Sequence, residues 1–250
     1  MCAALTEFHL PLPITEAQYY IGQRYLKSQE TFKDGVEIVR IDQYEDIPLM
    51  SDDRFSKGIF STRLLPVKKV PTIIAGSNGF QLEEQTWNAT QFVKTLIRPV
   101  GKFKDYLTIK LFFHLLDGDT SEEDNNIFEL VPKRLSERKL EKIDIADDLE
   151  DTKYLLDELP IQKGWMENAE TMMTVHCLMH IDCSGTPGLF RGILFNFIYN
   201  FTRTRLIKSH RKMLVTMNEW KDMTEDELSQ IEQKAFMAGK KDDENTISTC

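Results

Sequence analysis

The sequence predicts one α+β domain in which a curved antiparallel sheet wraps on a long C-terminal helix. Three observations predict this class: a helical segment near the start, a long run of strand-like segments after it, and the longest helical pattern after residue 188. No internal repeat and no proline- or serine-rich linker divides the chain, and its hydrophobic content of 41% suits a packed core. We therefore expect a single domain over residues 1–238 and a flexible tail over residues 239–250.

Two predicted helices begin with a capping box, in which two side chains satisfy backbone donors at the helix start. Thr15 and Gln18 have this spacing, and the helix that they open runs to about Ser28. Thr224 and Glu227 have the same spacing at the start of the last predicted helix. The first helix contains a group of large apolar residues, namely Tyr19, Ile21, Tyr25 and Leu26.

Most of the predicted strands lie in the first half of the chain. Short segments rich in β-branched and apolar side chains predict strands at residues 35–41, 58–65, 70–75 and 80–84. The clearest signal is an alternation of apolar and more polar side chains over residues 106–115, as in a half-buried strand. Its apolar face carries Leu107, Ile109, Leu111, Phe113 and Leu115. Residues 116–126 are acidic and polar and predict a loop.

The second half of the chain predicts two strands and the long helix. The strands are expected at residues 140–146 and 172–181, with an acidic surface connection over residues 147–164 between them. A Gly-Thr-Pro-Gly turn then precedes a helical pattern from about residue 189 to residue 218. Spacings of three and four residues give this helix an apolar stripe of Phe190, Leu194, Phe197 and Phe201.

Composition and charge exclude several classes of protein. The chain has 31 basic and 40 acidic residues, a net charge of −9, which argues against a general nucleic-acid binder. The same charge weakens attraction to anionic membranes, so any membrane contact should be local or transient. No apolar run is long enough to span a bilayer, no signal peptide is recognisable, and four cysteines are too few for a disulfide framework. We expect a soluble intracellular protein.

A cluster of histidine and cysteine residues near residue 180 first suggests a metal site, because zinc binds these residue types at short spacings. On a strand, however, His176 and His180 face one side while Cys177 and Cys183 face the other. Neighbours that point apart also cannot act as base and nucleophile, and no phosphate-binding glycine loop or nucleophile elbow is present. We therefore expect no metal, no cofactor and no catalysis; the alternative is an enzyme that uses His176 or His180.

A basic stretch covers the C-terminal half of the long predicted helix. It contains Arg203, Arg205, Lys208, Arg211 and Lys212. One interpretation is a solvated face that complements the helix dipole. The other is a surface that contacts a membrane.

A series of segments, taken in order, resembles the phosphatidylinositol transfer protein family. The resemblance extends from about residue 5 to residue 236, and the part around Glu84 and the Trp-Asn-Ala motif at residues 87–89 is the most specific. No single motif is decisive; the resemblance depends on the order in which all the motifs occur. The segments are Glu7-Phe8, Leu12-Pro13, residues 18–25, residues 35–37, residues 69–72, Glu84, residues 87–89, Thr95, residues 143–147, Lys153-Tyr154, residues 220–224 and Glu232.

This resemblance implies a fold related to the lipid-binding START domains, in which a concave sheet is closed by long helices around a lipid cavity. It also implies a soluble carrier that binds one phosphatidylinositol, and often phosphatidylcholine, and exchanges it between membranes. The implied ligand is the phospholipid itself, without a cofactor, and the implied partner is a transient membrane surface. We expect a cytoplasmic monomer, peripheral and transient at membranes, with no nucleic-acid partner.

The resemblance assigns four residues to the inositol ring. An Asn in the Trp-Asn-Ala motif and a Glu in the last helix bind the ring in this family, and they match Asn88 and Glu232. A Thr-x-Lys pair before Lys-Val-Pro also binds the ring, and its best match, with one gap, is Ser61 and Arg63. A competing alignment matches the Thr-x-Lys pair to Ser56 and Gly58 and so provides no cation.

The lipid phosphate is assigned fewer residues than the family provides. Gln23 and Thr95 match two of the family's phosphate contacts. A second Thr that contacts phosphate in the family falls at Phe112 or Phe113. A Lys on the strand before the long helix has no counterpart, although one of two residues, His176 or His180, is expected nearby.

The resemblance also places a membrane contact before the long helix. The family's tandem Trp, which enters the membrane, aligns with Thr186-Pro187, so Leu189 and Phe190 become the candidates for docking. An alternative function is a START-like sensor or binding module for another hydrophobic ligand, without transfer. Without the resemblance, the six headgroup residues would be interpreted as caps of turns and strands (Asn88, Thr95) or as ordinary surface groups (Gln23, Ser61, Arg63, Glu232).

Overall fold

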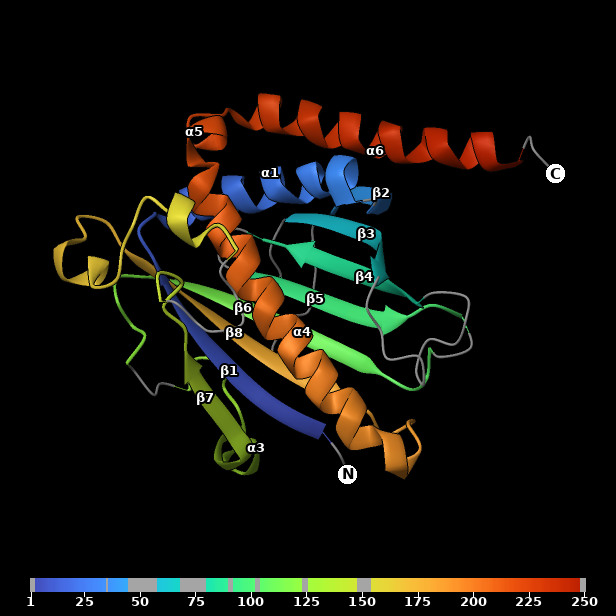
Figure 1. The fold of residues 1–250 in the computed structure, drawn as a ribbon, viewed down its shortest axis with the longest axis horizontal. Helices are drawn as coiled ribbons and strands as arrows, with labels where there is room; N and C mark the ends of the chain where they lie inside the picture. The colour runs from blue at the N-terminus through green and yellow to red at the C-terminus, as the bar shows by residue number, and fades with distance from the viewer. Residues whose placement is uncertain are drawn as a thin grey trace.

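Within the described residues, a mixed eight-stranded sheet forms the body of the fold (Figure 1). The structure is a computed structural model that describes residues 3–34, 36–44, 58–67, 80–89, 92–101, 104–122, 126–147 and 154–247. The strand order is β2-β3-β4-β5-β6-β8-β1-β7. The strands are β1 Ala3–Leu12, β2 Glu37–Tyr44, β3 Gly58–Val67, β4 Phe80–Asn88, β5 Phe92–Pro99, β6 Thr108–Asp117, β7 Arg138–Lys142 and β8 Met173–Asp182.

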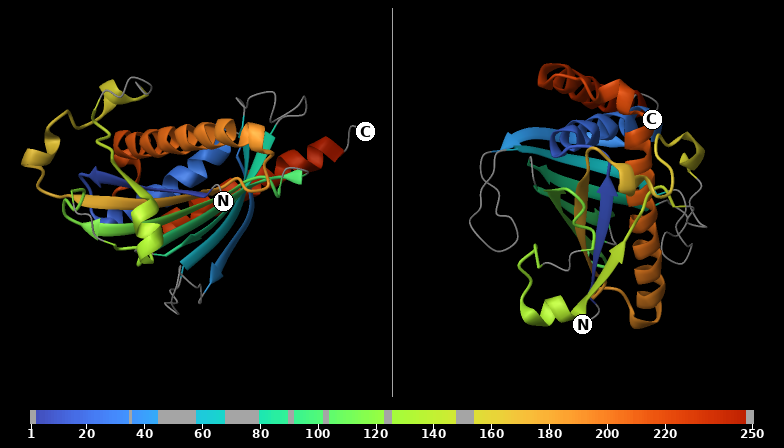
Figure 2. Two further views of the ribbon diagram at one scale, coloured as in Figure 1. Left: turned by 90° about the horizontal axis from the view of Figure 1, so that it is seen from below. Right: turned by 90° about the vertical axis from the view of Figure 1, so that its left-hand side faces the viewer.

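The long helices lie on one face of the sheet and at its β2 edge. Helix α4 crosses the sheet diagonally, α1 lies next to it, and α6 packs along α1 (Figure 1). Viewed along the sheet, α1 and α4 lie on the same side of the strands (Figure 2). Among the described residues, no helix is long and apolar enough to cross a membrane. The helices are α1 Glu16–Asp34, α3 Pro132–Glu137, α4 Gly188–Val215, α5 Met217–Trp220 and α6 Glu225–Ile247.

The expected fold class is confirmed, with one correction to the sheet. β1 pairs with β8 in antiparallel fashion but with β7 in parallel, so the sheet is mixed rather than antiparallel throughout. The sequence did not predict β1 as a strand, because residues 5–12 are buried on both faces and do not alternate. β7 covers only the start of the strand expected at residues 140–146.

The alternation over residues 106–115 is confirmed in β6, where Ile109, Leu111, Phe113 and Leu115 are all buried. β8 and β3 also lie where they were expected, whereas β4 is longer, and β5 was not predicted. The strand expected at residues 70–75 lies outside the described residues. Both capping boxes are present: the Gln18 N–H donates to the Thr15 hydroxyl over 3.2 Å, and the Glu227 N–H donates to Thr224 over 3.3 Å.

The helices differ from the expected boundaries at their C-terminal ends. α1 continues to Asp34, beyond the end expected near Ser28. α4 ends at Val215 and is followed by the short α5. α6 continues to Ile247 and so extends into the segment for which we expected a flexible tail; the flexibility itself stays a prediction.

Strand pairing separates the side chains into two faces. We call the face below α1 and α4 the inner face and the opposite one the outer face. Arg63 lies opposite Glu84, and Thr86 lies opposite Thr95, so these four side chains share one face. Arg63, Glu84 and Thr95 line a cavity together with residues of α1 and α4, which identifies that face as the inner one.

The basic stretch of α4 is largely bound to other parts of the protein. Arg203 pairs with Glu141 on β7, and Arg205 pairs with Glu84 on β4 over 3.1 Å. Arg211 is fully buried and donates to three carbonyl oxygens, those of Ile145, Asp147 and Tyr154. A solvated face is therefore the wrong interpretation for these three arginines. They fix α4 to the sheet and to the segment before β8.

Gly22 on α1 leaves room for the indole of Trp220. A Cβ at position 22 would lie 2.9 Å from two Trp220 ring carbons and 3.1 Å from Met213 Cγ. Trp220 is fully buried, and its Nε1 donates to the Met213 carbonyl, so the ring has little freedom to move.

We expect Gly22→Ala to lower the free energy of unfolding by about 1–3 kcal/mol, because the methyl overpacks this contact. Urea unfolding monitored by circular dichroism measures the change. Gly192→Ala on α4 is the matched control, since a Cβ there meets nothing within 4 Å and should raise the stability slightly. Equal midpoints for both variants would contradict the prediction.

Candidate functional site

Two adjoining cavities lie between the inner face and the helices. The larger, of about 100 Å³, is lined by α1, α4 and strands β3 to β6. The smaller, of about 30 Å³, is lined by α1, α6 and strands β2 to β4. Lys27 and Arg63 line both, so the two cavities form one candidate site.

All six residues expected at the lipid headgroup line these cavities. The four assigned to the inositol ring line the smaller cavity; they are Ser61, Arg63, Asn88 and Glu232. The two assigned to the phosphate line the larger cavity; they are Gln23 and Thr95. Elements far apart in the sequence therefore place these side chains around one space, although their roles toward a ligand stay a prediction.

Asn88 connects the two groups of residues. It is 4% exposed, and its Nδ2 donates to Gln23 Oε1 over 2.9 Å. Its Oδ1 is buried and has no hydrogen-bond partner among the residues that the structure describes. Thr95 is also buried, and its hydroxyl lies 3.2 Å from that of Thr86. The turn- or strand-capping role that the sequence alone allowed does not account for the free Asn88 acceptor.

Arg63 is the centre of a buried ion-pair network. Its side chain is 3% exposed, its Nε donates to Glu84 Oε1 over 3.0 Å, and its Nη1 donates to Glu30 Oε2 over 2.7 Å. Arg205 of α4 also contacts both carboxylates, at 3.1 Å and 3.7 Å. Burial raises the pKa of Glu84, but the charges of Arg63 and Arg205 outweigh it and hold that pKa well below its usual value. Arg63 is therefore no surface residue.

Glu232 is joined to α1 by a residue that the sequence did not single out. Arg24 forms a bidentate pair with it: Nε donates to Oε1 over 2.8 Å, and Nη2 donates to Oε2 over 2.7 Å. Arg24 is 3% exposed, and its Nη1 also binds Glu225 at the start of α6. An arginine in an amphipathic helix is usually predicted to be exposed to solvent. Arg24 is buried because α6 packs on α1, which its own sequence context does not reveal.

Two positions that depart from the family pattern are now located. Phe113 faces inward and lines the larger cavity, whereas Phe112 lies on the outer face, opposite Lys94. His176 and His180 alternate with Cys177 on β8 and share the outer face with Phe112 and Lys110. The expectation that either histidine lies near the headgroup is therefore wrong, because the sheet separates both from the cavities.

His210 lines the larger cavity. Burial lowers the pKa of His210 to about 4, so its ring is neutral near pH 7. Its Nδ1 donates to the Leu206 carbonyl over 2.7 Å, and its Nε2 lies 3.2 Å from the Tyr19 hydroxyl. The first bond lies within α4, and the second joins α4 to α1. The apolar part of the lining includes Leu26, Ile97, Leu111, Phe113, Phe201 and Leu206.

The expected docking residues lie at the start of α4. Leu189 is 89% exposed, whereas Phe190 is half-buried. Ile193, one turn further, is 51% exposed and was not singled out from the sequence. A groove of about 740 Å³ beside this half of α4 is lined partly by basic side chains, namely Lys133, Arg134 and Lys139. Contact with a membrane at this end of the molecule stays a prediction.

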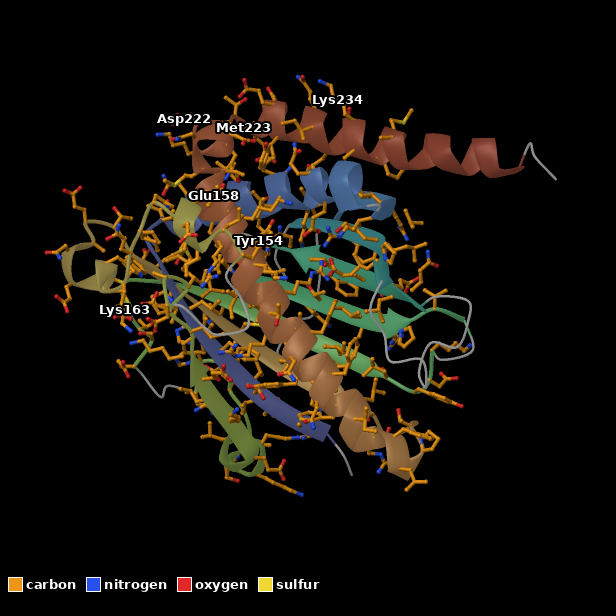
Figure 3. The ribbon with its side chains drawn as sticks, viewed as in Figure 1. Tyr154, Glu158, Lys163, Asp222, Met223 and Lys234 are labelled. Atoms are coloured by element: carbon orange, nitrogen blue, oxygen red, sulfur yellow. The ribbon has the colours of Figure 1, made fainter. Side chains whose placement is uncertain are left out.

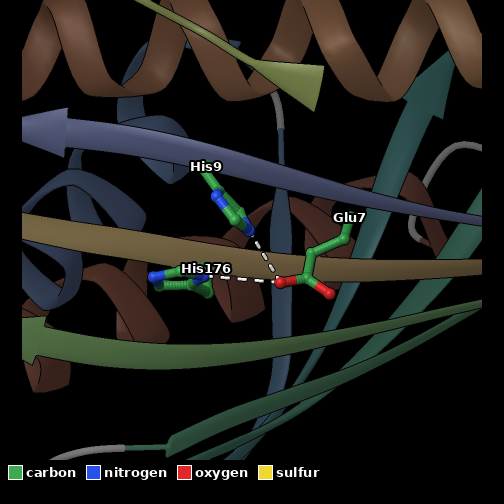
Figure 4. A group of neighbouring side chains, drawn as sticks. All are labelled: Glu7, His9 and His176. Carbon is green, nitrogen blue, oxygen red and sulfur yellow. Dashed lines mark hydrogen bonds and ion pairs between the residues drawn. The ribbon is translucent and has the colours of Figure 1, made fainter. Parts of the chain in front are cut away.

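A second polar cluster lies on the outer face, and Figure 4 shows three of its members, Glu7 and His9 of β1 and His176 of β8. Glu7 on β1 accepts from His9 over 2.7 Å, from Arg138 of β7 over 2.6 Å, and lies 3.4 Å from His176 of β8. Burial raises the pKa of Glu7, but the hydrogen bonds from these three side chains lower it to about 2. The ligand-type atoms of Glu7, His9 and His176 lie within 4.8 Å of one another, but Arg138 already neutralises the carboxylate. We interpret the cluster as a structural ion-pair network.

Comparison with known proteins gives a consistent result. The sequence model of the family described as "Phosphatidylinositol transfer protein" matches residues 3–236. Phosphatidylinositol transfer protein 2 of Dictyostelium discoideum is 26% identical, over 94% of this chain and 96% of its own length. Phosphatidylinositol transfer protein 4 of the same organism is 24% identical, over 93% and 74%. Cytoplasmic phosphatidylinositol transfer protein 1 of Xenopus tropicalis is 27% identical, over 91% and 72%.

Proposed function

This chain belongs to the phosphatidylinositol transfer protein family, and we propose that it encloses one phosphatidylinositol, or one phosphatidylcholine, and exchanges it between membranes. One observation supports the proposal most. The six headgroup residues, assigned from sequence alone, line two adjoining cavities under α1, α4 and α6. Unrelated surface residues would not be expected to gather in this way.

The physical task of such a carrier is to hide apolar surface from water. Each buried methylene contributes about 0.8 kcal/mol, so two acyl chains of roughly 30 methylenes correspond to on the order of 25 kcal/mol. The larger cavity, at about 100 Å³, is much smaller than a typical site for even a small ligand. Loading therefore requires α4 or α6 to move away from the sheet, a lid movement of the kind that gates many binding sites.

The headgroup roles follow from hydrogen-bond chemistry. Glu232 accepts from ring hydroxyls, and Asn88, with its free Oδ1, accepts from another. Ser61 donates to or accepts from the ring, and Arg63 supplies positive charge beside it. Gln23 and Thr95 donate to the phosphate. A buried headgroup needs all its polar atoms paired, because each unpaired one costs about 1–3 kcal/mol.

The same proposal covers partners and location. The chain acts as a monomer in the cytoplasm, contacts membranes transiently through Leu189 and Phe190, and uses the phospholipid as its only ligand, with no cofactor and no nucleic-acid partner. Its family is one of lipid transfer proteins rather than enzymes. A lipid sensor that binds without transfer remains the second candidate, and no described feature favours it.

Native mass spectrometry of the purified protein, followed by lipid extraction, tests the proposal directly. We expect one phosphatidylinositol or phosphatidylcholine per chain. Protein stripped of lipid should then move labelled lipid from donor to acceptor vesicles. Binding without movement would favour the sensor, and a chain that takes up no lipid at all would refute the carrier.

Glu232→Ala is expected to lower phosphatidylinositol transfer by about 10-fold or more, because a ring hydroxyl loses a charged acceptor. Phosphatidylcholine transfer should not fall, since choline carries no hydroxyl donor. Glu225→Ala is the matched control, because Glu225 also binds Arg24 but is 61% exposed and does not line the cavity. If phosphatidylinositol transfer survives Glu232→Ala, the assignment of Glu232 to the ring is wrong.

A further inference from the structure

Lys27 on α1 is a cation in the candidate site that forms no ion pair with a side chain in the part of the chain that the structure describes. It is half-buried and lines both cavities. Within the described residues, no hydrogen bond or ion pair to its ammonium group is found, although Glu30 and Glu84 are near enough to act on it electrostatically. A partly desolvated ammonium without a partner is unfavourable, so this position is suited to an anion from outside the protein.

The nearby carboxylates are already engaged. Glu84 and Glu30 are shared between Arg63 and Arg205. Glu232 has both oxygens bound to Arg24. The other three cations of the site therefore have partners, and Lys27 is the one among the described lining residues that does not.

Asn88 supplies a second, independent feature. Its buried Oδ1 has no hydrogen-bond partner among the described residues, and it lines the smaller cavity together with Lys27. A free acceptor next to a free cation complements a ligand that carries both a hydroxyl donor and a negative charge. A phosphodiester with a sugar-alcohol headgroup has both. A choline headgroup has no donor and brings its own positive charge.

We propose that Lys27 binds the phosphate of an anionic phospholipid and thereby selects inositol lipids over choline lipids. This inference rests on the proposed carrier function and adds to it a specificity residue supplied by α1. Both lipids carry a phosphodiester anion, but the quaternary ammonium of a choline lipid already neutralises it, whereas an inositol lipid keeps a net negative charge that can pair with Lys27. The choline ammonium would also add a cation to a site that already holds four, namely Arg24, Lys27, Arg63 and Arg205.

The charge of Lys27 gives the proposal a pH signature. Burial, and next the charge of Arg63, lower the pKa of Lys27 to about 8. A lysine is charged below its pKa, so uptake of the anionic lipid should fall as the pH rises from 7 to 9. Several charged or titratable groups face this region, namely Glu30, Arg63, Glu84, Arg205 of α4, the Arg24–Glu232 pair, the neutral His210 and the Tyr19 phenol, whose pKa burial raises.

Three variants test the proposal: Lys27→Met, Lys27→Arg, and, as the matched control, Lys234→Met, which removes an exposed lysine of α6 (Figure 3). Transfer of labelled phosphatidylinositol and of labelled phosphatidylcholine is measured in parallel with the same neutral vesicles, at pH 7 and at pH 9. Urea unfolding of each variant checks that the fold is kept.

We expect Lys27→Met to lower phosphatidylinositol transfer about 10-fold while phosphatidylcholine transfer changes little. Wild type should lose phosphatidylinositol transfer at pH 9, Lys27→Arg should retain it there because arginine stays charged, and Lys234→Met should behave as wild type. If Lys27→Met leaves phosphatidylinositol transfer unchanged, or lowers transfer of both lipids equally, the proposed role of Lys27 is wrong. The proposed carrier function would stand in either case. A wild type that transfers neither lipid overturns the proposed function itself.

Discussion

Replacing Glu7 with glutamine is expected to lower the free energy of unfolding by about 3–5 kcal/mol, because it leaves buried donors without their anion. Glu7 is fully buried and accepts from side chains on three strands: His9 on β1, His176 on β8 and Arg138 on β7. Urea unfolding at pH 7 measures the loss. Glu122→Gln is the control, since Glu122 is 82% exposed and its pair with Lys142 should contribute less than about 1 kcal/mol.

The same carboxylate predicts how stability depends on acid. The pKa of Glu7 is about 2 in the folded protein and returns to its ordinary value near 4.5 on unfolding. Because the folded pKa is the lower one, this stabilisation is present above pH 4.5 and is lost as the pH falls toward 2. It corresponds to about 3 kcal/mol. Glu7→Gln should lack this part of the acid dependence; parallel pH profiles for wild type and variant would contradict the assignment.

Arg63→Met is expected to lower both stability and transfer. Among the described residues, it leaves Glu84, whose side chain is 5% exposed, with the ion pair to Arg205 and a hydrogen bond from Thr86 over 3.5 Å. Removing one partner of a buried ion pair costs about 3 kcal/mol or more. The variant should also lose phosphatidylinositol transfer, since the ring-binding group of residues loses its cation.

A double variant separates these two effects. Arg63→Met with Glu84→Met replaces both partners by apolar side chains and leaves Glu30 beside Arg205, so most of the stability should return. Phosphatidylinositol transfer should stay low in both variants. If transfer returns together with stability, Arg63 serves the fold rather than the ligand. Arg40→Met, at an arginine that is 64% exposed, is the control.

The sequence predicted elements whose signal is local. β6 is half-buried, so its side chains alternate, and the capping boxes at Thr15 and Thr224 depend on four consecutive residues. β1 has no such signal because neighbouring strands cover both its edges and both its faces are buried. The parallel pairing of β7 with β1 joins segments more than 130 residues apart and could not be read from either one.

The site also contains residues that the sequence could predict and residues that only the tertiary structure reveals. Asn88, Glu232 and the other headgroup candidates were found through the family pattern, and strand register then placed Ser61 and Arg63 on the face of Thr95. Arg24 and Lys27 were not predicted as site residues, because a basic residue in a helix is ordinarily exposed at the surface. Only the tertiary packing of α6 on α1 and of α1 over the sheet encloses them. The histidines of β8 were expected near the headgroup because the period of a strand places both on one face but does not tell which face the helices cover.

The contact between Arg24 and Glu232 has a kinetic consequence for the proposed carrier. The carboxylate that holds α6 to α1 is the one assigned to the inositol ring. An inositol lipid must therefore compete with Arg24 for it, whereas a choline lipid leaves the pair intact. The two loaded forms should differ in how firmly α6 is held, and the choline-loaded form should release its cargo more slowly at a membrane that carries neither lipid.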